Sequence, residues 1–325
     1  MKKPTALSRR DFLQTAAGLV LTAGFSGACS TPRTVQPSKP WMVACRDAHL
    51  KATGQPDCWA ALKYLGVAGV EVDVTPEMLC PALFHPEKKY SLATPAGIEA
   101  LAAELAAQRV TLTAFCLHIR FDDRLEDEVA WMRRLVPVAQ ALNVQVIRID
   151  VAPRKTPVDQ FLPVAIKACK AVCEVVADRP VRLGIENHSR FTNDPAVLDQ
   201  LFAAAGSPQL GLTLDALNFY WYGWPLEELY GMYERFAPRV FHTHCKSVRY
   251  PPERRNIRRP MGWEYGQYAA PIYTGDIDYK RVVAILRKAH YQGDLCLENE
   301  CLKHFPAAEQ PGVLRKEIEL LKSLA

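Results

Sequence analysis

Four apolar segments in the second half of the chain each end at a side chain that can bind a metal ion. The segments are Val181–Glu186, Leu210–Asp215, Val240–His244 and Asp294–Glu298. Two glutamates, one aspartate and one histidine offer three oxygen ligands and one nitrogen ligand. This set suits Mn²⁺, Mg²⁺ or Co²⁺, whereas a structural zinc site would more often use thiolates. The sequence therefore predicts one divalent-metal site, with the ligands Glu186, Asp215, His244 and Glu298.

The spacing of these ligands is that of consecutive strand-and-helix units. Asp215 follows Glu186, and His244 follows Asp215, at the same interval of 29 residues, and a strand-plus-helix unit needs about 30 residues. The interval from His244 to Glu298 is 54 residues and contains a Pro- and Arg-rich insertion. In a (β/α)8 barrel the C-terminal ends of all strands share one face, where the active site lies. We therefore expect the four ligands on that face.

Strand-like and helix-like segments alternate over the whole chain after residue 40. The expected strands are Trp41–Cys45, Gly69–Val74, Val110–Leu117, Val144–Val151, Val181–Glu186, Leu210–Asp215, Val240–His244 and Leu295–Leu297. The expected helices are Asp57–Leu65, Thr94–Gln108, Leu125–Leu142, Val158–Ala177, Pro195–Ala205, Leu226–Phe236, Tyr279–Ala289 and Pro311–Leu324. This alternation favours a parallel sheet, and no GxGxxG motif follows the first strand to support a dinucleotide fold. We predict an α/β fold, a (β/α)8 TIM barrel over residues 41–325.

The first forty residues look like an export leader followed by a tether. Ser8-Arg9-Arg10-Asp11-Phe12-Leu13 resembles the twin-arginine motif, and the apolar stretch that follows it is shorter than the roughly 20 residues of a membrane span. We predict a twin-arginine signal peptide over residues 1–29 and a Pro-rich linker over residues 30–40. The expected location is the periplasm, reached through the twin-arginine export machinery after metal loading in the cytoplasm.

The end of the leader leaves two outcomes open. The small residues before Cys29 are similar to a lipobox, but Ser26 stands where that motif has a leucine. A lipid anchor at Cys29 and plain cleavage nearby are therefore both consistent with the sequence.

Charge and cysteine content narrow the class of protein. The net charge is +5, and Lys2, Lys3, Arg9, Arg10 and Asp11 of the leader supply +3 of it. The remaining chain is then close to +2, which gives no support for a nucleic-acid partner. Ten cysteines occur without CxxC pairs, and several lie inside apolar strand-like segments, so we expect buried free thiols rather than a disulfide framework.

Around the predicted ligands the sequence resembles the xylose isomerase-like TIM barrel superfamily, the sugar phosphate isomerase/epimerase group. The resemblance covers roughly residues 41–305 and is carried by Ile185-Glu186-Asn187-His188, Thr213-Leu214-Asp215, His242-Thr243-His244-Cys245-Lys246, Gly275-Asp276-Ile277-Asp278-Tyr279 and Gly293-Asp294-Leu295-Cys296-Leu297-Glu298-Asn299-Glu300. It implies the same four metal ligands. In that family a lysine or an acid follows the metal-binding histidine by two residues, and the ligand glutamate is the first of an E-x-E pair. The resemblance therefore favours His244, which precedes Lys246, over His242, and favours Glu298 over Glu300.

The resemblance implies a metal-dependent sugar isomerase or epimerase that works through an enediolate. In that family the two ligand glutamates also move the substrate proton, so Glu186 and Glu298 are the catalytic candidates. The residues that we expect to bind a carbohydrate substrate are His49, His118, His188, Asn218 and Lys246. Mn²⁺ is the expected ion, with Mg²⁺, Co²⁺ and Zn²⁺ as alternatives.

Two departures from the family pattern argue against simple ketose epimerisation. Asn218 stands where ketose 3-epimerases carry a substrate-binding histidine, and Lys246-Ser247 stands where they carry an acid after the metal histidine. A metal-dependent lyase or dehydratase, which would expel an oxygen substituent from the same enediolate, is the alternative enzyme. A periplasmic sugar-binding barrel without catalysis is the second alternative.

The long segment Arg249–Thr274 carries Arg254, Arg255, Arg258 and Arg259 beside aromatic residues. It is either a solvated basic loop or a lid that clamps an anionic or glycosidic substrate. The sequence also leaves oligomerisation open.

Overall fold

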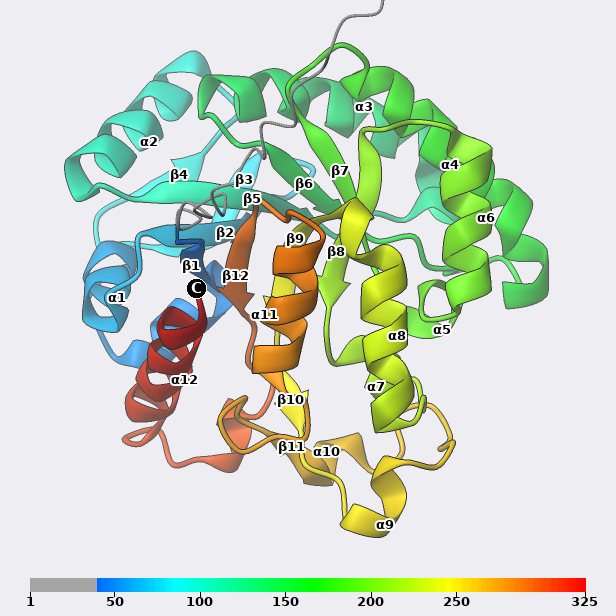
Figure 1. Ribbon diagram of the computed structural model, residues 1–325. Helices are drawn as coiled ribbons and strands as arrows, with labels where there is room; N and C mark the ends of the chain where they lie inside the picture. Colours follow the sequence, from blue (N-terminus) through cyan, green and yellow to red (C-terminus); the bar gives the residue numbers. More distant parts are fainter. Residues whose placement is uncertain (1–39) are drawn as a thin grey trace, which may run out of the picture. The chain divides into compact units, whose positions relative to one another are not determined.

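The computed structural model describes residues 40–325, so the predicted leader, Cys29 and nearly all of the predicted linker lie outside the described residues. Eight parallel strands form a closed barrel in the order β1-β12-β9-β8-β7-β6-β5-β2, with helices on its outside (Figure 1). The strands are β1 (Met42–Arg46), β2 (Gly69–Asp73), β5 (Thr111–Leu117), β6 (Val146–Ile149), β7 (Arg182–Glu186), β8 (Leu210–Asp215), β9 (Val240–Cys245) and β12 (Asp294–Leu297). The predicted (β/α)8 barrel is confirmed.

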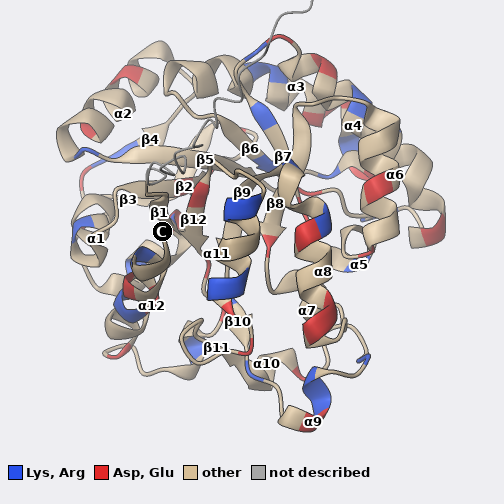
Figure 2. Cartoon of the chain, viewed as in Figure 1, with Lys and Arg blue, Asp and Glu red and all other residues tan. Residues whose placement is uncertain are grey.

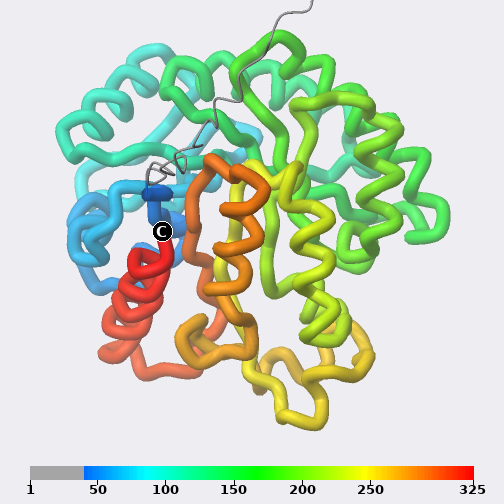
Figure 3. Tube along the Cα trace, viewed as in Figure 1, coloured from blue at the N-terminus to red at the C-terminus, as the bar shows by residue number. Residues whose placement is uncertain are grey.

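Eight longer helices surround the barrel, each close to a predicted helix. They are α1 (Cys58–Leu65), α2 (Pro95–Gln108), α3 (Phe121–Ala141), α4 (Phe161–Val176), α6 (Pro195–Ala205), α8 (Leu226–Phe236), α11 (Tyr279–Lys288) and α12 (Gln310–Leu324). Helix α3 is interrupted by a non-helical residue at Arg124, so its continuous part begins at the predicted Leu125. The trace in Figure 3 shows α12 returning beside the first strand, where it packs on β1 and closes the ring of helices.

Several short elements were not expected from the sequence. The short α-helices are α5 (Ser189–Thr192), α7 (Asn218–Trp221), α9 (Pro252–Arg255) and α10 (Tyr265–Tyr268), and the 3₁₀ helices are η1 (Asp47–Thr53), η2 (Val158–Gln160), η3 (Ala237–Arg239) and η4 (Leu302–His304). Two antiparallel strand pairs join β3 (Leu79–Phe84) to β4 (Lys89–Ser91) and β10 (Ser247–Val248) to β11 (Ala269–Ala270). Apart from η1 and β3, each has four residues or fewer, which is too short to give a clear periodic signal.

The helix starts follow local capping chemistry. Helices α1, α2, α6 and α11 each begin after a residue whose side chain accepts a hydrogen bond from the first turn: Asp57, Thr94, Asp194 and Asp278. Proline occupies the first turn of α2 and α6, where its missing N–H is no loss. These signals are local in sequence, which is why the helix boundaries could be predicted closely.

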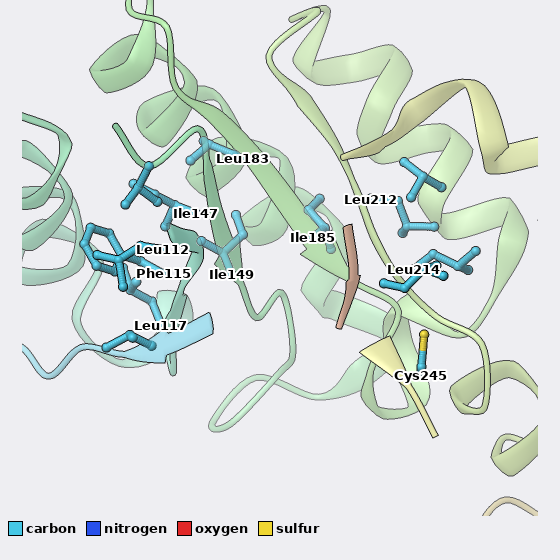
Figure 4. Packing of buried hydrophobic residues seen from close by; sticks show 14 of the residues in the cluster. Leu112, Phe115, Leu117, Ile147, Ile149, Leu183, Ile185, Leu212, Leu214 and Cys245 are labelled. Atoms are coloured by element: carbon cyan, nitrogen blue, oxygen red, sulfur yellow. The ribbon is translucent and has the colours of Figure 1, made fainter. Parts of the chain in front are cut away.

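Buried aliphatic side chains alternate with buried polar ones along several of the strands. Leu112, Ile147, Leu183 and Leu212 are among the buried residues that pack between neighbouring strands and helices (Figure 4). Strands buried on both faces read as nearly continuous apolar runs, which is the pattern that located them. Charged residues are found on barrel strands as well as on the helices (Figure 2), and Glu71 on β2 and Arg148 on β6 are both buried.

The strand register brings the predicted ligands together at one face of the barrel. Asp215 at the end of β8 is paired with His244 on β9, and His244 is also paired with Cys296 on β12. Glu298 follows β12 directly, and Glu186 is the last residue of β7. Each ligand therefore lies at the C-terminal end of its strand, as the spacing predicted.

The segment Arg249–Thr274 is structured. It contains α9, α10 and β11, and it follows β10, with which β11 is paired, beyond the end of β9 (Figure 1). Arg259 is buried and donates hydrogen bonds to the carbonyl oxygens of Tyr220 and Trp224 at 2.9 and 3.1 Å. Arg255 forms an ion pair with Asp276 at 3.1 Å. Arg255 and Arg259, two of the four clustered arginines in the segment, therefore hold it in place.

The nine cysteines within residues 40–325 are all buried and free of disulfides, as predicted. In the same part of the chain, no helix has both the length and the apolar character that a membrane span requires.

Asp278 gives a test of the local capping. Its Oδ1 accepts hydrogen bonds from the backbone N–H groups of Lys280 and Arg281 at the start of α11. We predict that Asp278→Ala lowers the free energy of unfolding by about 1 kcal/mol, the usual effect of losing a helix cap. Asp278→Asn keeps an acceptor and should lie close to wild type. Urea unfolding followed by circular dichroism measures both, and equal losses in the two variants would contradict the capping role.

Candidate metal centre

The four predicted ligands converge on one buried position. Glu186, Asp215, His244 and Glu298 are at most 6% exposed, and one ligand atom from each lies within 4.8 Å of the others. These residues come from four consecutive strands of the barrel, β7, β8, β9 and β12. The arrangement has the donor set and the size of a site for one divalent ion.

Within residues 40–325, three of the four ligands direct an atom without an aligned hydrogen bond into this position, although Lys246 Nζ lies 2.8 Å from Asp215 Oδ2 and 3.0 Å from Glu298 Oε2. Asp215 Oδ2, His244 Nδ1 and Glu298 Oε2 are buried, and none has an aligned hydrogen-bond partner among the described residues. His244 Nδ1 lies 3.2 Å from Glu298 Oε2 and 3.4 Å from Glu186 Oε1. Buried polar atoms are costly when their hydrogen bonding is incomplete, by roughly 1–3 kcal/mol for an atom with no partner at all. Three incompletely satisfied atoms at one point, two of which share the single ammonium group of Lys246, indicate a site for a further cation.

Glu186 is held by two neighbours. The Arg148 guanidinium donates to Glu186 Oε2 through Nε at 2.6 Å and also through Nη2, and the Asn218 amide donates to Glu186 Oε1 at 3.0 Å. Burial alone would raise the pKa of Glu186, but Arg148 and His244 outweigh it and hold the pKa well below its ordinary value. These contacts favour the charged form of Glu186 and hold its carboxylate in a fixed orientation.

Glu298 is held in a similar way from the other side of the site. Arg46 Nη1 donates to Glu298 Oε1 at 2.5 Å, and Lys246 Nζ lies 3.0 Å from Glu298 Oε2. Burial raises the pKa of Glu298, but Lys246, His244 and Arg46 together keep it well below its usual range. Both proposed catalytic glutamates are thus ionised, and each has one arginine partner.

The site is rich in acids relative to its cations. Lys246 is shared between Asp215 at 2.8 Å, Glu298 at 3.0 Å and Glu300 at 2.8 Å. Arg46 and Arg148 each contact at least two carboxylates as well. Buried carboxylates need compensating positive charge, and a divalent ion at the four ligands would supply it.

The pKa values respond to this shortage of positive charge. Burial raises the pKa of the Asp215 carboxyl to about 7, against the opposing effect of Lys246. The pKa of His244 lies well above its ordinary value because the carboxylates of Glu71, Glu298 and Glu186 outweigh burial. The raised pKa values of Asp215 and His244 favour their protonated forms, which reduce the negative charge of the site. Binding of a metal ion would displace these protons.

The motif around Glu186 also contains a structural residue. Asn187 Oδ1 accepts a hydrogen bond from the Asp215 N–H at 2.8 Å, and its Nδ2 donates to the Asp215 carbonyl oxygen at 2.9 Å. The amide ties the end of β7 to the end of β8. Two of the four ligands are fixed relative to each other in this way.

His118 and His188 lie at the rim of the site, on either side of Asp150. His188 Nδ1 is 3.2 Å from Asp150 Oδ1, and His118 Nδ1 is 3.6 Å from Asp150 Oδ2. The His188 side chain is 45% exposed and the His118 side chain is 61% exposed, whereas Asp150 is buried. Hydrogen bonding to Asp150 is the main cause that raises the pKa of both histidines, that of His118 to about 9. Both rings can therefore donate hydrogen bonds to a ligand.

The other three substrate-binding candidates are already engaged. Lys246 contacts three carboxylates, and Asn218 donates to Glu186 and also binds Asp215 through its backbone N–H. His49 Nε2 accepts a hydrogen bond from the Asn299 N–H at 3.0 Å, and burial lowers its pKa to about 4. In this structure these side chains position the ligand set, and contact with a substrate stays a prediction for them.

Residues from the early strands complete the site, and the sequence reasoning did not name them. Arg46, Glu71, Arg148 and Asp150 all contact a predicted ligand or a rim histidine. Each is a charged residue inside or directly after an apolar strand. A charge in a strand buried on both faces is costly, and that signal could have pointed to them.

Metal analysis tests the ligand set. We predict one divalent ion per chain in wild-type protein loaded with Mn²⁺ and its loss in Asp215→Ala, because that variant removes one ligand. Glu300→Ala is a matched control, since Glu300 lies two residues after Glu298 but is not a predicted ligand. Elemental analysis after dialysis gives the stoichiometry. Equal metal content in wild type and Asp215→Ala would rule out the site.

Similar proteins were found by sequence and by structure. The family model described as "Xylose isomerase-like TIM barrel" matches residues 59–324, and a search of curated proteins gave no significant match. A xylose isomerase-like TIM barrel protein from Mycobacterium smegmatis, solved in complex with magnesium, has 14% identity and a TM-score of 0.61, covering 87% of this chain and 96% of that chain.

Two further solved structures are named as enzymes. The 3-keto-D-glucoside 4-epimerase YcjR from E. coli has 12% identity and a TM-score of 0.61, covering 87% of this chain and 99% of that chain. The probable 3-DHS dehydratase AsbF from Bacillus anthracis has 14% identity and a TM-score of 0.61, covering 86% of this chain and 98% of that chain. At these identities the similarity shows a shared fold. Because the family model spans most of the sequence, the chain belongs to the xylose isomerase-like TIM barrel family.

Proposed function

We propose that this protein is a divalent-metal-dependent isomerase or epimerase of a sugar or sugar derivative. The observation that carries the proposal is the convergence of Glu186, Asp215, His244 and Glu298 at the C-terminal face of the barrel, with three of their atoms lacking aligned partners among residues 40–325. Active sites of such barrels lie on this face. The oxygen-rich donor set supports Mn²⁺ as the ion, with other hard or borderline divalent ions as alternatives.

The ion would supply positive charge that makes a C–H bond next to a carbonyl group more acidic. The chain must then move a proton. Glu186 and Glu298 approach the site from β7 and β12, which are separated in the barrel by β8 and β9. They can therefore face different carbons of one small molecule, one removing a proton and the other returning it.

The rim of the site suits a substrate with several hydroxyl groups. His118 and His188 offer donors on one side. On the other side Glu300 is 41% exposed, and it accepts hydrogen bonds from Lys246 and from Tyr265, both at 2.8 Å. Donors and acceptors on opposite sides of a metal site are suited to bind an uncharged polyol along its length.

A lyase or dehydratase is the second candidate, and the rim histidines favour it. Hydrogen bonding to Asp150 raises the pKa of His118 to about 9 and raises the pKa of His188 in the same direction, which favours protonated rings that could give a proton to a departing oxygen. A solved structure with this fold is named as a probable dehydratase. A barrel that binds a sugar without reacting is the third candidate.

One experiment separates the three functions. Purified wild-type protein with saturating Mn²⁺ is incubated in D₂O with a panel of sugars and keto-glycosides, and the products are analysed by NMR and mass spectrometry. We predict incorporation of deuterium at a carbon without fragmentation, which indicates an isomerase or epimerase. Loss of water or of a glycosidic group would instead establish the lyase. Binding without exchange over the whole panel would leave only the sugar-binding barrel.

The same exchange assay tests the roles of the glutamates. Glu186→Gln and Glu298→Gln each keep an oxygen for the ion but remove the base, so exchange should fall by at least about 10²-fold under saturating Mn²⁺. Lys246→Met tests the alternative in which the lysine is the base. Loss of exchange in Lys246→Met, together with full exchange in both metal-loaded Gln variants, would contradict the assignment to the glutamates.

We also propose export by the twin-arginine route, on the basis of Arg9 and Arg10 in the leader motif. Replacing both with lysine should leave the precursor in the cytoplasm, because the paired arginines are what the export machinery recognises in this motif. Fractionation and immunoblotting measure this, and delivery to the periplasm at the wild-type level would contradict the proposal. Palmitate labelling of wild type and Cys29→Ala tells lipidation from plain cleavage.

A further inference from the structure

Four buried side chains form a continuous polar chain that ends at the metal centre. Asp294 Oδ1 lies 2.6 Å from His242 Nδ1, and His242 Nε2 lies 3.5 Å from Glu71 Oε1. Glu71 Oε2 then lies 2.8 Å from His244 Nε2. His242 and His244 are two residues apart on β9 and point to the same side of the strand, with their ring centroids 5.3 Å apart.

This chain runs through the interior of the barrel. Glu71, His242 and His244 are 0% exposed, and Asp294 is 4% exposed. Such positions are normally filled by layers of branched aliphatic side chains. A buried carboxylate is costly unless it is paired and hydrogen-bonded. The presence of Glu71 here therefore indicates a role that an aliphatic side chain could not perform.

Glu71 is connected to two of the four metal ligands. It contacts His244 directly, and Arg46 Nε lies 3.3 Å from Glu71 Oε2 while Arg46 Nη1 donates to Glu298 Oε1. Glu71 lies on β2 and Arg46 ends the adjacent strand β1, whereas the four ligands belong to other strands. The early half of the barrel therefore supports ligands that are supplied by the late half.

We infer that Glu71 is the positioning residue that prepares His244 for the metal ion. By accepting a hydrogen bond from the Nε2–H of His244, it fixes the tautomer that leaves the Nδ1 lone pair free, and Nδ1 is the atom that faces Glu186 and Glu298. Carboxylates that hold a ligand histidine in this way raise its basicity and fix its ring orientation. His242, which is itself held by Asp294, places its Nε2 3.5 Å from the opposite oxygen of Glu71.

This inference rests on the proposed metal site, and the test follows the ion rather than catalysis. The metal-free full-length protein is titrated with Co²⁺, and the visible absorption bands of the bound ion report its ligands. Wild type is compared with Glu71→Leu and Glu71→Gln. Glu128→Gln is the matched control, because Glu128 is equally buried but lies on α3, where it binds Arg120 and Arg124.

We expect one Co²⁺ per chain in all four proteins. Glu71→Leu should bind Co²⁺ roughly 10–100-fold more weakly, the usual effect of losing a partner of a ligand histidine, with a changed visible spectrum. Glu71→Gln can still accept the His244 N–H through its amide oxygen, so it should recover part of the affinity and the wild-type band positions. Glu128→Gln should match wild type in both readouts.

Three results would overturn the inference. Unchanged affinity and spectrum in Glu71→Leu and Glu71→Gln would show that the carboxylate does not position His244, and would leave the metal site itself intact. Two ions in wild type and one in the Glu71 variants would make Glu71 a ligand, together with its neighbours His242 and Cys296. No binding by wild type would remove the proposed metal function and the inference together.

Discussion

The burial of several carboxylates at one end of the barrel is the constraint on which the rest of this structure depends. Glu71, Glu186, Asp215 and Glu298 are all at most 6% exposed, and none of them could be ionised there without positive charge nearby. Arg46, Arg148 and Lys246 supply part of that charge, and each is shared among several acids. The shortage of positive charge and the ligand atoms that lack an aligned hydrogen bond among the described residues together make a cation site the simplest account of the cluster.

The barrel architecture brings these charged residues together from distant parts of the sequence. Parallel strands place all of their C-terminal ends on one face, so residues far apart in the sequence meet there. Glu71 and His244 are in contact although they are 173 residues apart. Replacing any one member would leave the others buried and unpaired. The side chains around the site are therefore expected to act as a unit rather than as independent contributors.

The segment between β10 and β11 is connected to this face of the barrel by its own side chains. Arg259 and Arg255 are used internally, and Tyr265 reaches Glu300, which in turn contacts Lys246. The segment is thereby linked to the ligand set through two hydrogen bonds. Of the two interpretations that the sequence left open, a solvated basic loop does not account for these internal contacts, and a lid that clamps a substrate stays a prediction.

The sequence by itself determined the barrel, the helix boundaries and the convergence of Glu186, Asp215, His244 and Glu298, because strand patterns, helix caps and the spacing of strand ends are local properties of the chain. Only the tertiary structure showed that Arg46, Glu71 and Arg148 surround these ligands. It also showed that His118 and His188 share one aspartate. These contacts join strands on different sides of the barrel, and which residues meet across its interior depends on how the strands close into a ring, which no local pattern records.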